Sequence, residues 1–405
     1  MTKVELRTTS MAVGGEAVAR EDSGRVVFVA GALPDETVVV ELSEEKKTFA
    51  RGSVVEVVAA SPDRVAPPCP NVELGCGGCD WQHIDIEAQR ALRLQIVTDV
   101  LARDGKVDAP QVRAATPLPA EGLRTTVRGI ADADGRFAFR RRRSHDLIAV
   151  DSCLVAHPAV NDVIGQSTFA PGANVVIRVG ARTGEALVVV GPTSSKARVP
   201  EGVTVVGEGD LKGGHRVWIH EQVADRSWRV SAKAFFQASP EGAEALVAAA
   251  QDLIDEHAPD AERLVDLCCG VGLFAGTVGQ GKAVVGVERS AASVADARQN
   301  LADLDARVVK VALARWRPSP ADVVVADPAR SGLGADGVAA VVGTGAGLCV
   351  LVSCDPAALG RDAALLADAG YQHVGSQVVD LFGHTSHIEV VSGFTKSEEV
   401  GRDEG

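Results

Sequence analysis

The sequence predicts an α/β domain with an open parallel sheet in the C-terminal half of the chain, preceded by two smaller β-rich domains. Three observations lead to this fold class. Beyond residue 233, apolar β-branched runs alternate with helical stretches, which is typical of parallel strands joined by crossover helices. The first 60 residues consist of short β runs broken by Gly and Pro, which indicates a small β-barrel. At 405 residues the chain is also too long for one ordinary core.

The composition limits the class of protein. With 46% apolar and 23% charged residues the chain is globular, and no apolar run approaches the ~20 residues that span a bilayer. The first ten residues lack the apolar centre of a signal peptide, so we expect a cytoplasmic protein without membrane contact. A net charge of −13 argues against a protein that coats nucleic acid generally, although a local basic patch can still bind RNA.

The N-terminal barrel is expected over residues 1–60, with glycine and proline residues at its turns. Strands and turns alone are equally consistent with a plain β-module that binds no ligand. The residues Gly14–Arg20, Val26–Val29 and Leu33-Pro34 resemble the TRAM domain, an OB-like barrel that binds RNA.

A cysteine group follows a proline-rich link at residues 62–70. Cys69, Cys76 and Cys79 are separated by six and two residues, with glycines between the last two, and such spacing is typical of a metal site. Eight cysteines in a cytoplasmic chain also indicate metal binding or catalysis rather than disulfides. The fourth ligand is expected to be Cys153, with His83 as a weaker candidate. Spacing alone fits a structural zinc site as well as an iron–sulfur cluster.

A basic stretch lies at residues 124–145, where seven arginines stand against two aspartates. Arg140–Arg143 are consecutive and follow Phe137 and Phe139 closely. A run of charges is often only a solvated face, but arginine interleaved with aromatic residues suits RNA bases and phosphates equally well. The short β segments of residues 146–232 indicate a small sheet, whose only residue with a predicted chemical role is Cys153.

A nucleoside site is predicted in the C-terminal half. Residues 263–274 indicate a strand, a glycine turn with Gly270 and Gly272, and a helix, while the strand at 283–287 ends in Glu288. Glycines let the backbone approach a ligand, and an acid at such a strand end commonly holds ribose hydroxyls. Because the chain has neither a G-x-G-x-x-G turn nor a Walker lysine, S-adenosylmethionine fits better than a dinucleotide or a triphosphate.

Candidate reacting residues stand at the ends of further strands. Cys354 follows the apolar run 348–352 and precedes a helical stretch, and Asp327 follows the run 321–326. The carboxyl ends of strands in an open α/β sheet gather ligands and reacting groups, so Cys354 is either a nucleophile or a small apolar filler. Glu389 stands at the start of the last strand, where a plain surface acid is the alternative.

Five motifs occur together in one order: FFQAS at 235–239, DLCCGVGLF at 266–274, DPARSG at 327–332, SCDPAALGRD at 353–362 and DLFGHTSHIE at 380–389. Over nearly the whole chain the sequence resembles the RNA uracil-5-methyltransferase family. The resemblance implies a TRAM domain at 1–60, a central domain at 61–84 and 109–232, and a Rossmann-like class I S-adenosylmethionine-dependent methyltransferase domain at 233–394. The helix at 85–108 would pack on that catalytic domain, and residues 395–405 would form a disordered tail.

The resemblance also implies the roles of individual residues. Cys354 would be the nucleophile and Glu389 the base. A 4Fe-4S cluster would bind Cys69, Cys76, Cys79 and Cys153. Contacts to the cofactor are implied for Gln237, Cys268, Gly270, Gly272, Leu273, Glu288 and Asp327.

Several positions depart from the usual family pattern. Six residues rather than five separate the first two cluster cysteines, and Cys268 stands where an aromatic residue is usual, which weakens stacking against the cofactor. The residues Ala329, Asp355 and Gly383 replace Pro, Asn and Pro. None of these changes removes a reacting group.

The chemistry of this reaction independently explains the residue types. C5 of uracil is a weak nucleophile, and a thiolate that adds at C6 turns the ring into an enolate whose C5 accepts a methyl group. A carboxylate must then remove the C5 proton so that the cysteine leaves, and the target base has to leave its stack first. Cys354 and Glu389 suit these two roles, and Gln237 and Asp327 can read the uracil edge.

Other functions fit parts of the sequence. The same reaction could act on the T-loop uridine of tRNA, but a barrel plus a cluster favours 23S rRNA, because bacterial tRNA members usually lack both. A non-catalytic RNA-binding or iron–sulfur sensor protein would not require Cys354 and Glu389. A cytosine-5 methyltransferase would carry a Pro-Cys motif where Asp327-Pro328-Ala329 stands. We expect the protein to be a monomer.

Overall fold

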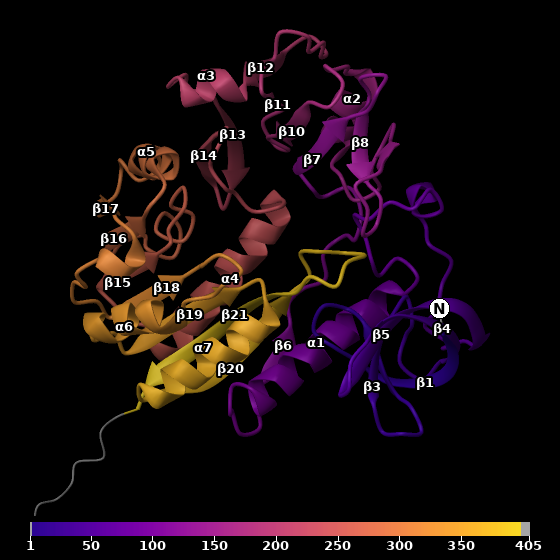
Figure 1. The fold of residues 1–405 in the computed structure, drawn as a ribbon. Coiled ribbons are helices and arrows are strands. Elements are labelled where there is room, and N and C mark those ends of the chain that lie inside the picture. Colours follow the sequence, from indigo (N-terminus) through magenta and orange to yellow (C-terminus); the bar gives the residue numbers. More distant parts are fainter. Residues whose placement is uncertain (1, 398–405) are drawn as a thin grey trace, which may run out of the picture.

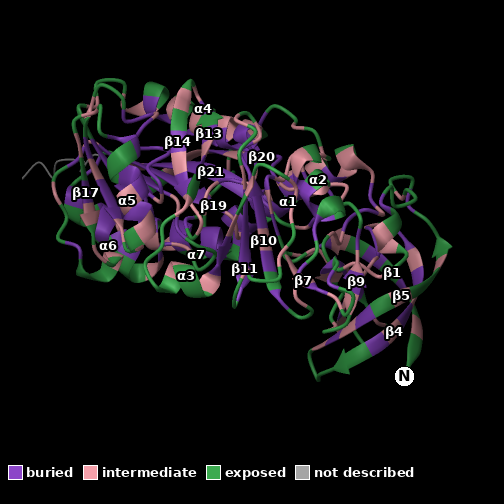
Figure 2. Cartoon of the chain, turned by 90° about the horizontal axis from the view of Figure 1, so that it is seen from above, coloured by how far each residue is buried: buried purple, intermediate pink, exposed green. Residues whose placement is uncertain are grey.

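The computed structural model of the chain describes residues 2–397. Most of the expected tail, residues 398–405, therefore lies outside the described residues. Figure 1 shows a small barrel near the N-terminus, a central sheet, and a larger α/β domain that carries the C-terminal half. Figure 2 shows that the strands at the centre of the α/β domain are buried, whereas the rims of the barrel are exposed.

The N-terminal domain is a closed barrel of strand order β1-β2-β3-β5-β4, which confirms the predicted small barrel. Inward and outward side chains alternate along its strands, and Val27, Val29, Val38 and Val40 are fully buried. The strands are β1 (Lys3–Met11), β2 (Ala17–Arg20), β3 (Val26–Ala30), β4 (Thr37–Glu45) and β5 (Phe49–Ala59).

The central domain contains a six-stranded sheet of order β12-β11-β10-β7-β8-β9. Helix α2 (Pro158–Gln166) buries Val160, Val163 and Ile164 against this sheet. The strands are β7 (Thr126–Ala131), β8 (Phe137–Arg140), β9 (Leu147–Ala149), β10 (Asn174–Val179), β11 (Ala186–Gly191) and β12 (Val203–Gly207), followed by the short helix α3 (Glu208–Lys212). A single 3-10 turn, η1 (Pro70–Val72), lies in the cysteine loop.

The α/β domain has an eight-stranded sheet of order β17-β16-β15-β18-β19-β21-β20-β6. Only β21 runs antiparallel to its neighbours β19 and β20. Its strands are β15 (Arg263–Leu267), β16 (Ala283–Glu288), β17 (Ala306–Lys310), β18 (Val323–Ala326), β19 (Leu348–Ser353), β20 (Tyr371–Val379), β21 (Glu389–Lys396) and β6 (Val112–Ala114). The connecting elements are α4 (Pro240–His257), α5 (Ala291–Asn300), η2 (Leu313–Arg315), α6 (Gly334–Thr344) and α7 (Pro356–Asp368).

Three segments differ from the sequence-based expectations. Residues 112–114, expected in the central domain, form β6 and pair with β20. The hairpin β13 (Trp218–Val223) and β14 (Arg226–Ser231) forms a separate sheet that packs against α5. The expected helix after the glycine turn is instead a series of turns over residues 268–281. Repeated glycines explain this last difference, because glycine disfavours the helix interior.

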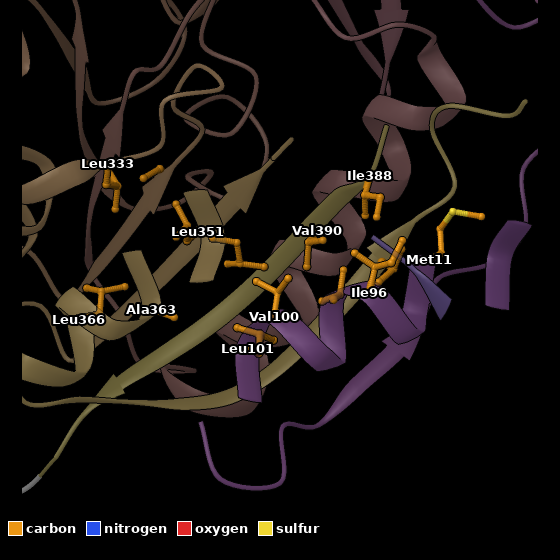
Figure 3. Close-up of a cluster of buried hydrophobic side chains, with 14 of the residues drawn as sticks. Met11, Ile96, Val100, Leu101, Leu333, Leu351, Ala363, Leu366, Ile388 and Val390 are labelled. Atoms are coloured by element: carbon orange, nitrogen blue, oxygen red, sulfur yellow. The ribbon is translucent and has the colours of Figure 1, made fainter. Parts of the chain in front are cut away.

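Helix α1 (Ile86–Arg103) covers one face of the eight-stranded sheet. It begins at Asp85, whose side chain accepts a hydrogen bond from the Glu87 amide. Its apolar side buries Ile96, Val100 and Leu101 near Ile388 and Val390 of the segment that forms β21, as Figure 3 shows. Leu92, which the sequence places on the same face, is only half-buried.

Arg93 of α1 holds the loop that leads into β21. The side chain is 1% exposed, and its guanidinium donates to Asp380 Oδ1 at 3.0 Å and to the carbonyls of Phe382 and Thr385, both at 2.8 Å. It also lies 5.5 Å from the ring of the buried Trp81. Periodicity assigns the charged residues of an amphipathic helix to its polar side, so this contact is not visible from the sequence pattern. The loop of residues 380–388 is thereby tied to α1.

We expect Arg93→Met to destabilise the protein by about 2 kcal/mol, because it leaves the buried Thr385 carbonyl without its donor and removes one of the two arginines that bind Asp380. Urea unfolding followed by circular dichroism measures the change. The matched control on the same helix is Arg103→Met, since Arg103 pairs with Asp104 at the surface and should matter by less than about 1 kcal/mol. Equal losses for the two variants would contradict the role of Arg93.

Candidate active site and cysteine cluster

The carboxyl ends of β15, β16, β18 and β19 lie along one edge of the eight-stranded sheet. Because β21 runs antiparallel to β19, the start of β21 lies at this same edge. The residues predicted to act on the substrate or cofactor stand at the ends of different strands and therefore lie together at this edge. The order of the strands reverses between β15 and β18, which is where an open α/β sheet forms its ligand crevice.

Cys354 and Glu389 occupy neighbouring positions on paired strands. Ser353 of β19 pairs with Val390 of β21, so the next residue of each strand is one of these two. Burial raises the pKa of the Cys354 thiol to about 11, and the nearby carboxylates of Glu389 and Asp327 add to the rise. Glu389 is 4% exposed, and burial followed by repulsion from Asp327 raises its pKa well above the usual range. The pair is thus a thiol beside a strongly basic carboxylate.

Asp327 and Gln237 meet beside this pair. Gln237 is buried and its Nε2 donates to Asp327 Oδ2 at 3.0 Å. Burial raises the pKa of Asp327 to about 7, while the bond from Gln237 acts in the opposite direction. The structure therefore brings together four of the residues named from the sequence: Gln237, Asp327, Cys354 and Glu389.

The glycine turn lies against Glu288 at the end of β16. Gly270 N donates to Glu288 Oε2 at 3.1 Å, and the Ser290 amide donates to Oε1 at 2.6 Å. Gly270 has a φ of +55°, and a Cβ placed there would meet no atom within 4 Å, so open space adjoins the turn. Cys268 also has a positive φ, of +62°, a conformation that strains a residue with a side chain. Strain of this kind is typical of a site that binds a ligand.

Gly272 and Leu273 differ from the rest of the predicted cofactor group. A Cβ on Gly272 would come within 3.1 Å of the Leu301 side chain, and Leu273 is 6% exposed within an apolar cluster that includes Trp228. These two residues pack against the protein interior and support the glycine turn from that side. Cys268 is half-buried, and burial followed by repulsion from Glu288, Asp266 and Asp327 raises the pKa of its thiol to about 12.

Sequence reasoning missed Asp266, the acid inside β15. Its carboxyl is fully buried: Oδ2 accepts a hydrogen bond from the Ala275 amide at 2.9 Å, and Oδ1 has no partner among the described residues. Burial raises the pKa of Asp266 to about 8, and repulsion from Asp327 and Glu288 contributes. The available signal was an acid within an apolar strand run, where an ionised group is costly.

The four predicted cluster cysteines lie near one another. Burial raises the pKa of the thiols of Cys76, Cys79 and Cys153, and neighbouring cysteines add to each rise. Cys69 contributes to the rise at Cys76, and Cys76 contributes to the rises at Cys79 and Cys153. Cys153 also contributes to the rise at Cys79. No three His, Cys, Asp or Glu side chains within residues 2–397 converge as ligands of a single ion. His83, the weaker candidate, is not among the charges that act on these thiols, and its Nε2 lacks a partner in the described chain.

The cysteine loop contacts all three domains. In the α/β domain, the Ser386 amide donates to Asp80 Oδ1 at 2.8 Å, in the loop that leads to Glu389. Trp81 Nε1 donates to the carbonyl of Gly15 in the barrel at 3.2 Å. From the central domain, Arg142 Nη2 donates to the carbonyl of Cys79 at 3.1 Å. A change in the conformation of the cysteine loop would therefore shift the loop that leads to Glu389.

A groove of about 770 Å³ runs along this junction. Its positive charge comes from Arg128 and the turn Arg140–Arg143, and Arg143 is paired at 2.9 Å with Glu16 of the barrel. Its lining also includes Thr385, Ser386 and His387, which lie just before Glu389 in the chain. The basic stretch found in the sequence thus adjoins the candidate active site.

Comparisons with known proteins show the family of this chain. The TRAM domain model matches residues 4–55. An uncharacterized RNA methyltransferase of Streptomyces coelicolor is 36% identical, over 96% of this chain and 92% of the relative. The 23S rRNA (uracil(1939)-C(5))-methyltransferase RlmD of Halomonas elongata is 32% identical, over 99% of this chain and 91% of its own length. The chain belongs to the RNA uracil-5-methyltransferase family.

A solved structure agrees with the fold that this family assignment implies. The tRNA (uracil-54, C5)-methyltransferase of Pyrococcus abyssi, in complex with S-adenosyl-L-homocysteine, aligns with a TM-score of 0.73. The match covers 97% of this chain and 100% of that one at 20% identity, so it supports the fold and not the substrate. The expected S-adenosylmethionine-dependent methyltransferase fold with an N-terminal TRAM barrel is confirmed. Within residues 2–397, no helix is both long and apolar enough to cross a membrane.

The raised pKa of Asp266 predicts a pH-dependent stability. A proton bound in the folded state up to about pH 8, but released near 3.8 in the unfolded chain, stabilises the protein at low pH. This contribution is lost as the pH rises through the folded pKa. The melting temperature of Asp266→Asn relative to the wild type should therefore increase between pH 5.5 and pH 8.

Asp322→Asn provides the control for this titration. Its hydrogen bond from Arg263 lowers the pKa of Asp322, so this acid is ionised in both states throughout the tested range. The melting-temperature difference for Asp322→Asn should stay constant with pH. A constant difference for Asp266→Asn as well would show that Asp266 does not titrate as described.

Proposed function

We propose that this protein transfers a methyl group from S-adenosylmethionine to C5 of a uridine in RNA, through a covalent bond between Cys354 and C6. The observation that carries the proposal is the adjacency of Cys354 and Glu389 on paired strands, next to Asp327 and Gln237. We further propose 23S rRNA as the substrate, since the RlmD relative with that substrate aligns over nearly its whole length.

The cofactor would lie beside the glycine turn and Glu288. Gly270 leaves open space, Glu288 offers carboxylate oxygens to ribose hydroxyls, and Gln237 and Asp327 stand at the end nearer to Cys354. S-adenosylmethionine supplies an electrophilic methyl group and a positive charge when bound. The carboxylates of Asp327 and Glu288 disfavour a charge on Asp266 here, so a cation suits this pocket.

Cys354 has to lose its proton before it adds to C6. Its high pKa keeps it a thiol in the free protein, while Arg330 acts in the opposite direction. In our proposal the thiol proton moves to Asp327, whose pKa of about 7 suits an acceptor near neutral pH. The sulfur then bonds to C6 as the C5–C6 π electrons shift toward O4. The enolate formed in this way bonds C5 to the methyl carbon, the sulfur–methyl bond of the donor breaks, and S-adenosylhomocysteine is left.

Glu389 completes the reaction in this proposal. Its carboxylate removes the C5 proton, the electrons of that bond restore the C5–C6 double bond, and the bond between C6 and the Cys354 sulfur breaks. Burial makes Glu389 a stronger base than an exposed carboxylate, which favours this step. The positive charge of the bound methyl donor would favour the ionised form of Glu389 before methyl transfer, and the loss of that charge in the transfer would then make the carboxylate more basic.

The RNA would follow the arginine-lined groove to the catalytic edge. Arg128 and Arg140–Arg143 can contact phosphates, and Phe139 in the same groove offers a face to a base. The groove lining includes His387, two positions before the proposed base. Binding of a single strand with the target base turned out of its stack fits this arrangement.

We also propose that Cys69, Cys76, Cys79 and Cys153 hold a 4Fe-4S cluster rather than zinc. One zinc ion needs four ligand atoms around a single point, whereas a cluster takes each thiolate on a different iron. The Cys76 thiol lies near those of Cys69, Cys79 and Cys153, so the four can hold one group together, and the family resemblance favours the cluster. The Gly78 amide, 3.5 Å from Cys76 Sγ, can donate to a ligated sulfur.

The alternative substrate is the T-loop uridine of tRNA, which the Pyrococcus abyssi protein modifies according to its name. We favour rRNA because that likeness has only 20% identity, against 32% for the rRNA enzyme. In keeping with a ribosomal substrate, we propose a monomer that acts in the cytoplasm.

The two reacting residues should fail at different steps. With 23S rRNA transcript and S-adenosylmethionine, Glu389→Gln should accumulate a methylated covalent complex, because glutamine keeps the shape but accepts protons very poorly. Cys354→Ala should form none, because nothing adds to C6. Denaturing gels with labelled RNA measure the adduct.

The wild type provides the control for this experiment and should release methylated 23S rRNA while leaving tRNA transcript unmodified. Turnover of Glu389→Gln at the wild-type rate would mean that another group is the base. Methylation of tRNA alone would mean that tRNA, and not 23S rRNA, is the substrate.

Protein purified without oxygen should contain about four irons per chain, the content of one 4Fe-4S centre. Metal analysis and the visible absorption of the cluster measure this. Cys153→Ser should lose the iron, whereas Cys349→Ser, a buried cysteine of β19, should retain it. Stoichiometric zinc without iron would replace the cluster by a zinc site.

A further inference from the structure

The segment that carries Gln237 is anchored by the central domain. This segment, residues 231–238, connects β14 to α4 and has no regular secondary structure beyond Ser231. Within it, Phe235 is 67% exposed while Gln237 is 6% exposed and reaches Asp327. A chain without helix or strand partners relies on other groups for its backbone hydrogen bonds, and those groups decide where its side chains lie.

Arg178 of β10 supplies two of these hydrogen bonds. Its Nη1 donates to the carbonyl of Ser231 at 3.0 Å and its Nη2 to that of Ala234 at 2.8 Å. Its third bond, from Nε to Thr126 Oγ1 at 3.2 Å, fixes the guanidinium on the neighbouring strand β7. A planar guanidinium holds two carbonyls at once in a set geometry, which a lysine ammonium cannot reproduce.

The environment of Arg178 is unusual for a structural arginine. The residue is 7% exposed, and no carboxylate lies within 4.0 Å of its charge among the described residues. Burial and the nearby Arg128 lower the pKa of Arg178 to about 10. A buried charge whose acceptors are two carbonyls and one hydroxyl is costly, and the more distant Asp296 offsets only part of that cost, so a plain packing role would be met better by an apolar side chain.

Thr125 holds the other end of the segment. Its amide and its Oγ1 both donate to the carbonyl of Ala238, at 2.9 Å and 3.1 Å. Thr125 is 4% exposed and directly precedes β7. Gln237 therefore lies between two anchors, both from the central sheet. The start of the segment is also bound by Asp296 of α5, which accepts from Ser231, so the anchor that only Arg178 provides is at Ala234.

We infer that Arg178 is a positioning residue for methyl transfer: together with Thr125 it sets the place of Gln237, and through Gln237 that of Asp327. The inference rests on the proposed function and deepens it by giving the central sheet a role in the chemical step. Without Arg178, the carbonyl of Ala234 loses its donor and Gln237 can drift from Asp327. Displacement of a site residue by about 1 Å can reduce a rate by as much as ~100-fold.

The test compares Arg178→Met, Arg178→Lys and the wild type in full-length protein. We expect kcat for RNA methylation to fall at least about tenfold in Arg178→Met. The affinity for S-adenosylhomocysteine, measured by calorimetry, should weaken in the same variant. Affinity for the RNA should stay within about twofold, since Arg178 does not line the groove. Arg178→Lys should recover part of kcat, because an ammonium can still donate to one carbonyl.

Two further variants keep the test decisive if Arg178→Met folds poorly. Thr125→Val removes only one hydrogen bond to Ala238 and should lower kcat in the same direction by a smaller factor. Thr168→Val is the control in the same domain, because the side chain of Thr168 is exposed and bonds neither to Arg178 nor to the segment. Its kcat should remain within about twofold of the wild type.

Action through Gln237 is tested by combining the changes. If Arg178 works through Gln237, the double variant Arg178→Met/Gln237→Ala should be no slower than Gln237→Ala alone. Multiplied losses, or a kcat of Arg178→Met within twofold of the wild type, would overturn the inference. If the wild type transfers no methyl group to RNA, the proposed function fails. The calorimetric comparison of wild type and Arg178→Met would then still decide whether Arg178 orders the pocket.

Discussion

The edge of the eight-stranded sheet where Cys354 and Glu389 lie depends on the contacts that hold the loop of residues 380–388. This loop delivers Glu389 to the start of β21, yet it has no regular structure of its own. Arg93 satisfies two of its carbonyls and binds Asp380, and Gln89 accepts from the amide of His384 at 2.9 Å. Helix α1, which comes nearly 300 residues earlier in the chain, therefore acts as the support of the proposed base.

The same support joins the domains. Trp81 stacks under Arg93 and donates to the barrel at Gly15, while its own amide donates to the carbonyl of His384. A Cβ on Gly15 would come within 2.3 Å of Ser386, so only glycine lets the barrel turn approach the loop this closely. Barrel, cysteine loop and catalytic sheet thus share one packed junction, and the arginine-lined groove runs along it.

The sequence was most informative where local pattern and fold agree. The run Leu348–Val352 could be recognised as a buried strand, and the placing of Cys354 at its end followed from the parallel sheet. The motif order also identified Gln237, Asp327 and Glu389, although no local pattern shows that they meet. Arg93 and Arg178 could not be found in this way, because each looks like a surface arginine. Their partners lie about 290 and 55 residues away, and periodicity carries no information about such contacts.

The buried acids of this site lower the stability of the folded protein. Asp266, Asp327 and Glu389 are kept from water without a matching cation among the described residues, and burial raises the pKa of all three. A protein selected for stability alone would replace at least one of them by an apolar or amide side chain. A site that receives a positively charged methyl donor gains from the same arrangement, because the incoming charge relieves the repulsion among the acids. In the free protein the raised pKa values keep Asp266 and Glu389 protonated near neutral pH, and the proposed binding of a cation beside them would favour their ionised forms.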